Sequence, residues 1–393
     1  MEKGLSFEKS KRMKNLPPYL FAEIDRMIEK ARDEGVDVID FGVGDPDLPT
    51  PDHIVRAMKK AVDDPSTHGY PSYEGMEEFR TAVGNFYSDR FNVDLDPGKE
   101  IISLIGSKEG LAHIPFCYLN PGDIALVPDP AYPVYKTSVV MAGGEPITLP
   151  LKAENDFLPD LAELDEETLR SARLIYLNYP NNPTGATADL GFFQEVVDLA
   201  REYEFIVIHD SAYSEIYFEE NKPPSLLQAA GAREVGIEFG SLSKTFNMTG
   251  WRLGWTAGNS EIVETLGTLK TNIDSGVFKA IQRAGITALE QSRDCVEEAS
   301  KIFKERRDLL VQGLNELGWN VEANPATYYV WARIPEKYED SQEFSRHIFE
   351  KTGVFFTPGM GYGEQGRRFV RMALTVKKER IKEALERLKS NQL

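Results

Sequence analysis

The sequence has 393 residues, 41% of them hydrophobic and 27% charged, an ordinary composition for a globular protein large enough for two domains. Asp and Glu number 63 against 45 Lys and Arg, so the formal net charge is −18, and neither nucleic acid nor an anionic membrane is expected as a partner. The polar start lacks the apolar core of a secretory signal, and no apolar run approaches the ~20 residues that cross a bilayer. These features predict a cytoplasmic protein.

Cysteine and histidine are too sparse to suggest a metal centre. The two cysteines, Cys117 and Cys295, lie far apart, and the five histidines show neither His-x-x-His nor His-x-x-x-His spacing. We therefore expect no protein-ligated metal, and we expect both cysteines to be small core side chains.

The predicted elements begin with an N-terminal arm that contains Pro17-Pro18 and leads into a strand at residues 36–44. A strand-like run at residues 100–105 then turns into a helical segment. Apolar residues at helical spacing lie further along the chain, within residues 190–200. Short apolar runs that predict buried strands flank that helix: residues 123–128, 173–178, 205–209 and 235–239. Alternating strands and helices predict a mainly parallel sheet with helices on both faces, and with ligands outside the carboxyl ends of the strands.

The C-terminal part predicts a second, smaller unit. It contains a long helix at residues 296–317, strand-like pieces at 327–334 and 369–374, and an amphipathic helix at 379–388. The two chain ends are expected to combine. Residues 1–45 then form the arm and part of a small domain, residues 46–289 a large domain, and residues 290–393 the rest of the small domain.

One glycine pattern suggests a nucleotide site but lacks the right surroundings. Gly361-Tyr-Gly-Glu-Gln-Gly366 fits GxGxxG, yet the segment that follows is strand-like, so no helix N-terminus is offered to a pyrophosphate. No GxxxxGK[ST] is present either. Neither a dinucleotide site nor a nucleotide P-loop is expected.

Each strand end in the middle of the chain runs into a polar loop. Tyr132 lies in DPAYP, Asn182 in NYPNNPTG, Asp210 and Tyr213 in DSAY, and Lys244 in SLSK. Taken alone, NNPTG is a tight turn and Lys244 could be a surface charge. Asp210 directly after an apolar strand needs a partner if it is buried, and a protonated ring nitrogen of a cofactor would be one.

Two segments could hold a phosphate. Ser241, Ser243 and Arg252 lie close in sequence, and the arginine fork suits a phosphate. At Ser107 and Lys108 a strand turns into a helix, whose first backbone N–H groups would form a second cradle. A lysine, a carboxylate, a stacking aromatic and an anion site together fit pyridoxal 5′-phosphate.

NNPTG, DSAY and SLSK with Arg252 resemble the aspartate aminotransferase-like, class I/II family of pyridoxal-phosphate enzymes of fold type I. Further segments that carry the resemblance, among them GDPDLPTP, YPSYEGMEEFR and TPGMGYGEQG, extend it over nearly the whole chain. The resemblance implies a large domain with a mostly parallel seven-stranded sheet flanked by helices, plus a smaller α+β domain formed by both chain ends.

The resemblance also implies roles for single residues. Lys244 would bond the cofactor and move the substrate proton, and Asp210 would keep the pyridine nitrogen protonated. Asn182 and Tyr213 would donate hydrogen bonds to the ring 3-oxygen. Tyr132 would stack on the ring, although it could be a core tyrosine at a turn. The phosphate would be bound by Ser107, Lys108, Ser241, Ser243 and Arg252.

Substrate and subunit contacts complete this set. Arg371 would bind the α-carboxylate; Arg367 and Arg368 compete from sequence alone, and strand alternation puts Arg367, with Phe369, on the face of Arg371. Gly44 and Tyr19 would approach the substrate, or be a turn residue and an arm anchor.

Tyr70 matches a tyrosine that in this family reaches the phosphate of a neighbouring subunit, which implies a homodimer; Tyr73 is an alternative to it. The two arginines of RRFVRMAL are more basic than the family pattern leads us to expect, so an anionic distal group could be bound differently.

The implied activity is transamination between an amino acid and a 2-oxo acid. The leading expectation is transfer from LL-2,6-diaminoheptanedioate to 2-oxoglutarate in lysine biosynthesis, with aspartate, alanine or another amino acid as the alternative donor. A lyase on the same scaffold and a cofactor-sensing regulator domain are two further candidate functions. The net charge and the absence of a helix-turn-helix pattern argue against the regulator.

Overall fold

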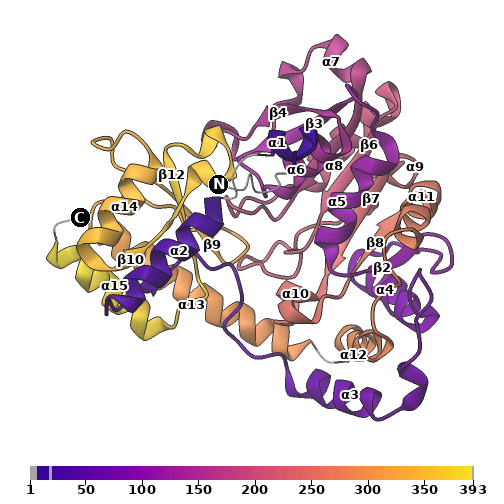
Figure 1. Ribbon diagram of the computed structural model, residues 1–393, viewed down its shortest axis with the longest axis horizontal. Coiled ribbons are helices and arrows are strands. Elements are labelled where there is room, and N and C mark those ends of the chain that lie inside the picture. The colour runs from indigo at the N-terminus through magenta and orange to yellow at the C-terminus, as the bar shows by residue number, and fades with distance from the viewer. Residues whose placement is uncertain (1–6, 17–19, 292, 392–393) are drawn as a thin grey trace, which may run out of the picture.

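The structure is a computed structural model that describes residues 7–16, 20–291 and 293–391, apart from the side chains of residues 20–23 and 25. A seven-stranded sheet lies at its centre (Figure 1). Its strands, in spatial order, are β2 (Ile101–Leu104), β8 (Gly254–Gly258), β7 (Gly236–Ser241), β6 (Ile206–Asp210), β5 (Ala172–Asn178), β3 (Ile124–Asp129) and β4 (Glu145–Pro150). Only β8 runs antiparallel to its neighbours. The prediction of a mostly parallel seven-stranded sheet is confirmed.

The two faces of this sheet are covered by different helices because successive strand residues point to opposite sides. On one face, Leu174 and Tyr176 pack in a cluster with side chains of α5 (Ser107–Tyr118), α6 (Val134–Ala142) and α11 (Ser260–Thr271). On the other, Ile175 and Leu177 pack against α8 (Leu190–Tyr203). The helix predicted within residues 190–200 is therefore present, and its apolar stripe faces the sheet.

A second layer of helices covers the edge of the sheet near β2 and β8. There α4 (Glu77–Phe91) and α12 (Lys279–Glu290) pack together with the strand residue Trp255. The other α-helices described in this part are α3 (Asp52–Val62), α7 (Glu166–Ser171), α9 (Ala232–Val235) and α10 (Leu242–Thr245). Lys244 lies on α10, immediately after β7.

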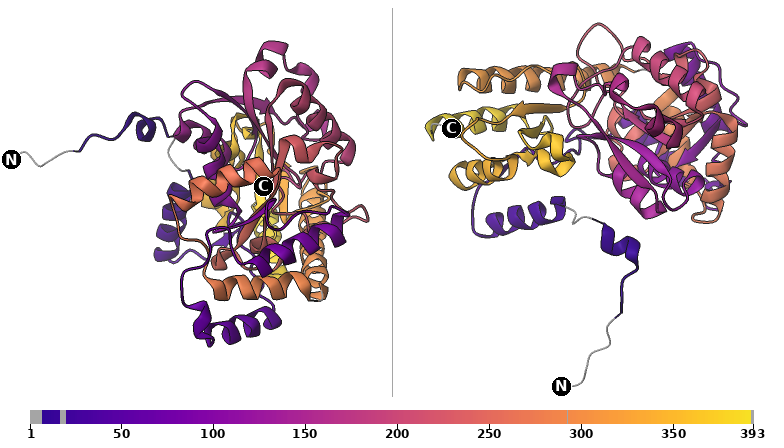
Figure 2. Two further views of the ribbon diagram at one scale, coloured as in Figure 1. Left: turned by 90° about the vertical axis from the view of Figure 1, so that its right-hand side faces the viewer. Right: turned by 90° about the horizontal axis from the view of Figure 1, so that it is seen from above.

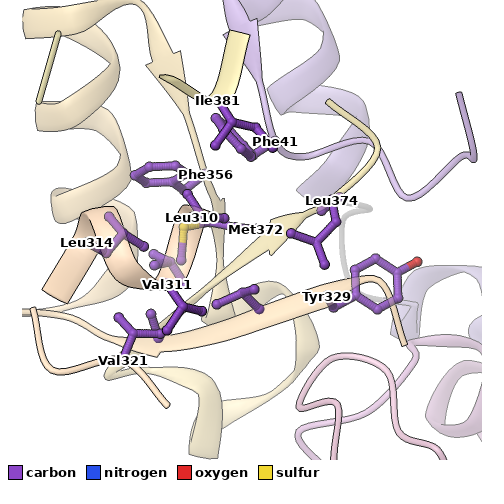
Figure 3. Close-up of a cluster of buried hydrophobic side chains, with 14 of the residues drawn as sticks. Phe41, Leu310, Val311, Leu314, Val321, Tyr329, Phe356, Met372, Leu374 and Ile381 are labelled. Carbon is purple, nitrogen blue, oxygen red and sulfur yellow. The ribbon is translucent and has the colours of Figure 1, made fainter. Parts of the chain in front are cut away.

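Both ends of the chain meet in a separate part of the molecule (Figure 1). Its helices are α2 (Leu20–Asp33), α13 (Asp294–Glu316), α14 (Ser341–Thr352) and α15 (Lys378–Ser390). Its short strands are β1 (Ile39–Asp40) paired with β10 (Val354–Phe355), and a three-stranded antiparallel sheet of β11 (Thr357–Pro358), β12 (Phe369–Ala373) and β9 (Tyr329–Arg333). Figure 3 shows part of the core, where Phe41 from the N-terminal side joins Phe356, Met372 and Ile381 from the C-terminal side.

Residues 7–16 form a peripheral segment that contacts the large part beside α6. They contain the short helix α1 (Lys11–Asn15), which buries no residue, and Phe7 is 90% exposed. Figure 2 shows this segment at the periphery of the molecule.

The structure corrects several predicted boundaries. The strand predicted at residues 36–44 is limited to Ile39–Asp40, because the Asp40 carboxylate accepts the Gly42 N–H and the chain then turns away as a loop.

Two strands of the central sheet were not predicted from the sequence. Glycine begins and ends β8, and β4 is partly exposed, so neither shows a buried apolar run. GxGxxG lies in two 3-10 turns that lead into β12, as the strand-like sequence after it indicated.

No helix in the described ranges is both long and apolar enough to cross a membrane.

Candidate active site

A cavity of about 490 Å³ opens at the carboxyl ends of the central parallel strands. Its lining comes from both parts of the molecule in Figure 1. Most of the predicted site residues line it: Gly44, Ser107, Lys108, Tyr132, Asn182, Asp210, Tyr213, Ser241, Ser243, Lys244, Arg252 and Arg371. Parallel strands deliver their following loops to one edge of a sheet, which explains why residues so far apart in sequence meet here.

Lys244 points its amine at the segment that follows β1. Its Nζ donates to the Gly44 carbonyl oxygen at 3.0 Å, and it lies 5.9 Å from the centre of the Tyr328 ring. The short helix that carries it is capped by Ser241, whose Oγ accepts the Ser243 N–H at 3.1 Å. Lys244 is therefore a half-buried amine held inside the cavity and is not a surface charge.

Asp210 ends β6 and is buried. Tyr135 Oη donates to its Oδ2 at 2.7 Å, and the Ala212 N–H donates to Oδ1 at 3.2 Å. Burial raises the pKa of the Asp210 carboxyl, while the Tyr135 hydrogen bond acts in the opposite direction. A buried carboxylate in this position favours a cationic group beside it.

Arg371 is 5% exposed and is fixed in place by groups from three segments. Its Nη1 donates to Asn182 Oδ1 at 3.0 Å, and its Nη2 donates to the Gly42 carbonyl oxygen at 2.8 Å. Its guanidinium carbon lies 4.1 Å from the centre of the Tyr329 ring. Its buried Nε has no hydrogen-bond partner in the described part of the chain. Such a fork, with a donor left over, suits a carboxylate.

Ser107 and Arg252 line the cavity where they could form an anion cradle. Ser107 begins α5, and the residue before it, Gly106, has φ +74° and supplies no capping side chain. A Cβ on Gly106 would collide with the Arg252 guanidinium. Arg252 donates from Nη1 to the Thr249 carbonyl at 3.0 Å and from Nη2 to the Ile105 carbonyl at 3.3 Å. Open helix N–H groups beside a fixed guanidinium are what a phosphate group needs.

Lys108 and Tyr132 lie between that cradle and Asp210. Lys108 Nζ lies 5.5 Å from the centre of the Tyr132 ring, and burial, together with the neighbouring Arg252 charge, lowers the pKa of Lys108. Tyr132 and Tyr135 pack in a T-shaped arrangement with ring centres 6.0 Å apart. The residues present therefore fit pyridoxal phosphate: an amine, a buried carboxylate, an aromatic face and a phosphate cradle lie around one cavity.

Some predicted residues do not join this group. Tyr70 is 86% exposed and Tyr73 is 47% exposed, and neither lines the cavity. Tyr19 lies outside the described residues. No cluster of His, Cys, Asp and Glu that could hold a metal ion occurs among residues 7–16, 20–291 and 293–391.

The structure corrects the inference about the arginines beside Arg371. Arg367 precedes β12 and is helical in conformation, so strand alternation does not extend to it. It pairs with Glu339 and Glu364, while Arg368 donates to the backbone carbonyls of Tyr338 and Pro335. Neither lines the cavity, so the extra basic charge of RRFVRMAL is used within the small part of the molecule.

Sequence reasoning missed several cavity residues. Tyr135 holds Asp210, and Tyr329 lies between Arg371 and Tyr213. The signal for Tyr135 was its position three residues after Tyr132 at the start of a helix, which places it on the same side of the chain. For Tyr329 the sequence TYYVWARI offered two adjacent tyrosines without indicating which one faces the cavity.

The chain belongs to the aminotransferase class I and II family, whose model matches residues 36–388. This confirms the family resemblance and the fold type I α/β architecture that it implied, and identifies the chain as an enzyme of a pyridoxal-phosphate-dependent family.

Similar proteins match over almost the full length. The LL-diaminopimelate aminotransferase of Halothermothrix orenii is 62% identical over 386 residues, which are 98% of this chain and 99% of the relative. That of Aquifex aeolicus is 52% identical over 387 residues, covering 98% of this chain and 100% of the relative. The solved structure of BacF from Bacillus subtilis superposes with a TM-score of 0.95 at 38% identity, covering 99% of this chain and 98% of BacF.

Proposed function

We propose that this protein binds pyridoxal 5′-phosphate and transfers an amino group from LL-2,6-diaminoheptanedioate to 2-oxoglutarate, as in lysine biosynthesis. The observation that carries the substrate assignment is 62% identity over 98% of the chain to a protein named for that donor. The chemistry is supported independently by the cavity, which holds an amine, a buried carboxylate and two arginines.

The bound cofactor supplies an electron-accepting ring that stabilises negative charge on the substrate α-carbon. We assign Lys244 to the covalent bond with the cofactor and to the movement of the α-proton, because its Nζ already lies inside the cavity. Asp210 keeps the ring nitrogen protonated. Its buried carboxylate is fixed by Tyr135, so the charge cannot turn away from the ring. Asn182 and Tyr213 donate to the ring 3-oxygen.

The rest of the ring's contacts follow from the anion cradle. Tyr132 offers its face to the ring, while Ser107, Lys108, Ser241, Ser243 and Arg252 bind the phosphate. Ser241 Oγ accepts an N–H within its own helix cap, so its hydroxyl proton is left to donate to the phosphate.

The substrate α-carboxylate binds Arg371, which is preorganised by Asn182 and Gly42. We propose Tyr19, which lies outside the described residues, as a further substrate contact. Gly44 presents its carbonyl to Lys244 and lets the backbone of this segment approach the substrate.

We further propose that the active enzyme is a homodimer in which Tyr70 reaches the phosphate of the other subunit. An aromatic side chain that is 86% exposed outside the cavity supports this role. We also propose a division of the chain into domains. Residues 1–45 form an arm with part of a small domain, residues 46–289 a large domain and residues 290–393 the rest of the small domain. The meeting of both chain ends in one core supports this division.

A visible absorption spectrum during titration with amino donors tests this function. The purified protein should absorb in the visible with cofactor bound, and the band should bleach on adding LL-2,6-diaminoheptanedioate and recover on adding 2-oxoglutarate. Aspartate, alanine and the other common amino acids serve as comparison donors. Bleaching by one of these with no response to the diamino acid would contradict the substrate assignment while leaving the aminotransferase chemistry intact.

A further inference from the structure

Tyr329 connects the carboxylate-binding end of the cavity to the cofactor-binding residues. It lies on β9, and its ring is stacked against the Arg371 guanidinium at 4.1 Å. Its hydroxyl oxygen lies 2.9 Å from that of Tyr213, which lies on the loop after β6. Both side chains are buried. A hydrogen bond therefore crosses between the small antiparallel sheet and the central sheet at the place where the cofactor is expected.

The direction of this hydrogen bond follows from a count of protons. If the one proton of Tyr213 goes to the ring 3-oxygen, its oxygen can only accept from Tyr329. Tyr328 is the neighbouring phenol, but its Oη donates to the Gly44 carbonyl at 3.3 Å. Burial raises the pKa of Tyr213 and of Tyr328 well above the usual range, so both are neutral donors near pH 7.

Gly44 gives independent support for the position of the Tyr329 hydroxyl. A Cβ at residue 44 would collide with Tyr329 Oη, and the backbone of Gly44 is not in the left-handed region. The glycine is therefore required by the space that this hydroxyl occupies and not by backbone conformation. Glycine at position 44 thus makes room for the Tyr329 phenol, whereas the sequence suggested that it lets the backbone approach the substrate.

We propose that Tyr329 is a positioning residue that donates its hydroxyl proton to Tyr213 and thereby strengthens the hydrogen bond from Tyr213 to the 3-oxygen of the cofactor. In a chain of hydrogen bonds each donor polarises the next. The cation of Arg371 over the Tyr329 ring adds to this polarisation. The inference rests on the cofactor part of the proposed function and is independent of which amino acid is the donor.

The measurable consequence is the proton affinity of the Lys244 nitrogen once it is bonded to the cofactor. A strong hydrogen bond to the 3-oxygen withdraws negative charge from it, so the oxygen attracts the nearby nitrogen proton less and the pKa of that nitrogen falls. Removing the Tyr329 hydroxyl should therefore raise this pKa. The charged and titratable groups facing the pair, Arg371, Lys244, Tyr328 and Tyr362, stay the same in all variants below.

The test is a pH titration of the visible absorption of the holoprotein without substrate. Tyr329→Phe should raise the pKa by roughly half a unit, since it weakens a bond at one remove, and Tyr213→Phe by roughly one unit. Tyr329→Phe added to Tyr213→Phe should change nothing further, because the chain is already broken. Tyr338→Phe, which removes another buried phenol hydroxyl outside the cavity, should leave the pKa unchanged.

The possible results separate the role of Tyr329 from the cofactor proposal and from the substrate assignment. An unshifted pKa in Tyr329→Phe, or shifts that add in the double variant, would overturn the inference. If Tyr329→Phe does not fold, Gly44→Ala replaces it, and an unshifted pKa there has the same meaning. A wild-type protein that shows no visible band with added pyridoxal phosphate would overturn the cofactor proposal and this inference together, whereas a normal band with no response to the diamino acid affects only the substrate assignment.

Discussion

The two arginines of the cavity differ in how the chain supports them. Arg252 is exposed and is held by backbone carbonyls of Thr249 and Ile105, beside the open helix start at Ser107. Arg371 is buried, and its partners are a side chain from the central sheet, a carbonyl from the N-terminal segment and an aromatic ring from β9. The end proposed to bind the phosphate is thus built from two short segments of one part, and the end proposed to bind the carboxylate contrasts with it. The carboxylate end exists only when both parts of the molecule are assembled.

The strongest test removes the amine that lies between these two ends. Lys244→Ala should abolish the covalent visible band and lower turnover by roughly 10⁴-fold or more, because both the bond to the cofactor and the proton carrier are lost. Rapid-quench assays and absorption spectra measure this. Lys108→Ala, which removes a cavity lysine outside the proposed bond, serves as the control and should keep the band. Full turnover by the Lys244 variant would contradict the assignment.

The next test compares the two arginines by their separate effects on cofactor affinity and on the kinetics of the amino donor. Arg371→Ala should lower kcat/KM for the amino donor by roughly 10²–10³-fold through loss of a charge-assisted fork, while cofactor affinity stays within about twofold. Arg252→Ala should do the reverse: cofactor affinity falls by about tenfold or more, and KM measured at saturating cofactor changes little. Equilibrium dialysis and steady-state kinetics separate the two. Equal effects of both variants on both quantities would remove the distinction between the ends.

A smaller effect is expected from Gly106→Ala. The added Cβ meets the Arg252 guanidinium, and alanine at φ +74° and ψ 152°, a region essentially limited to glycine, is strained by about 1–3 kcal/mol. Cofactor affinity should fall by about tenfold, with little change in donor KM once the cofactor is bound. Gly250→Ala, where a Cβ meets nothing within 4 Å, is a matched control close to the same arginine. Unchanged cofactor affinity in Gly106→Ala would show that the cradle tolerates a displaced Arg252.

The smallest effect concerns the stability of the apoprotein. The pKa of Asp210 is raised in the folded state, so its ionisation opposes folding above that pKa, and this cost disappears as the pH falls towards the ordinary value of 3.8. Asp210→Asn should therefore stabilise the apoprotein at pH 7 by on the order of 1 kcal/mol while lowering activity. Urea unfolding of both apoproteins at pH 7 and pH 4.5 measures it. A difference that grows at the lower pH would contradict this sign.

The contrast between the two ends also explains how far the sequence could be interpreted. NNPTG, DSAY and SLSK with Arg252 are local motifs at strand ends, and a parallel sheet collects such ends at one edge, so the gathering of these residues around one cavity could be predicted. The central sheet could be predicted because buried parallel strands are continuous apolar runs. The exceptions were β4 and β8, which are partly exposed or bounded by glycine.

The carboxylate end was harder to predict, because its geometry depends on contacts between segments more than a hundred residues apart. Arg371 was identified, but nothing in RRFVRMAL indicated that its neighbours would be Asn182 and Tyr329. The face assigned to Arg367 was wrong, because the strand begins only at Phe369. The hydroxyl pair of Tyr213 and Tyr329 depends on how β9 packs against the loop after β6, which no local pattern encodes.

The loop after β1 holds both the arginine proposed to bind the substrate carboxylate and the lysine proposed to act at the substrate amine. The Gly42 carbonyl holds Arg371 and the Gly44 carbonyl holds Lys244, so two residues of one backbone segment set the span between the carboxylate site and the amine. An α-amino acid carries its carboxylate and its amine on one carbon, so this one segment supports the residues proposed for both groups. The proposed donor carries this unit twice with the same handedness, so either of its ends can enter first without altering the outcome.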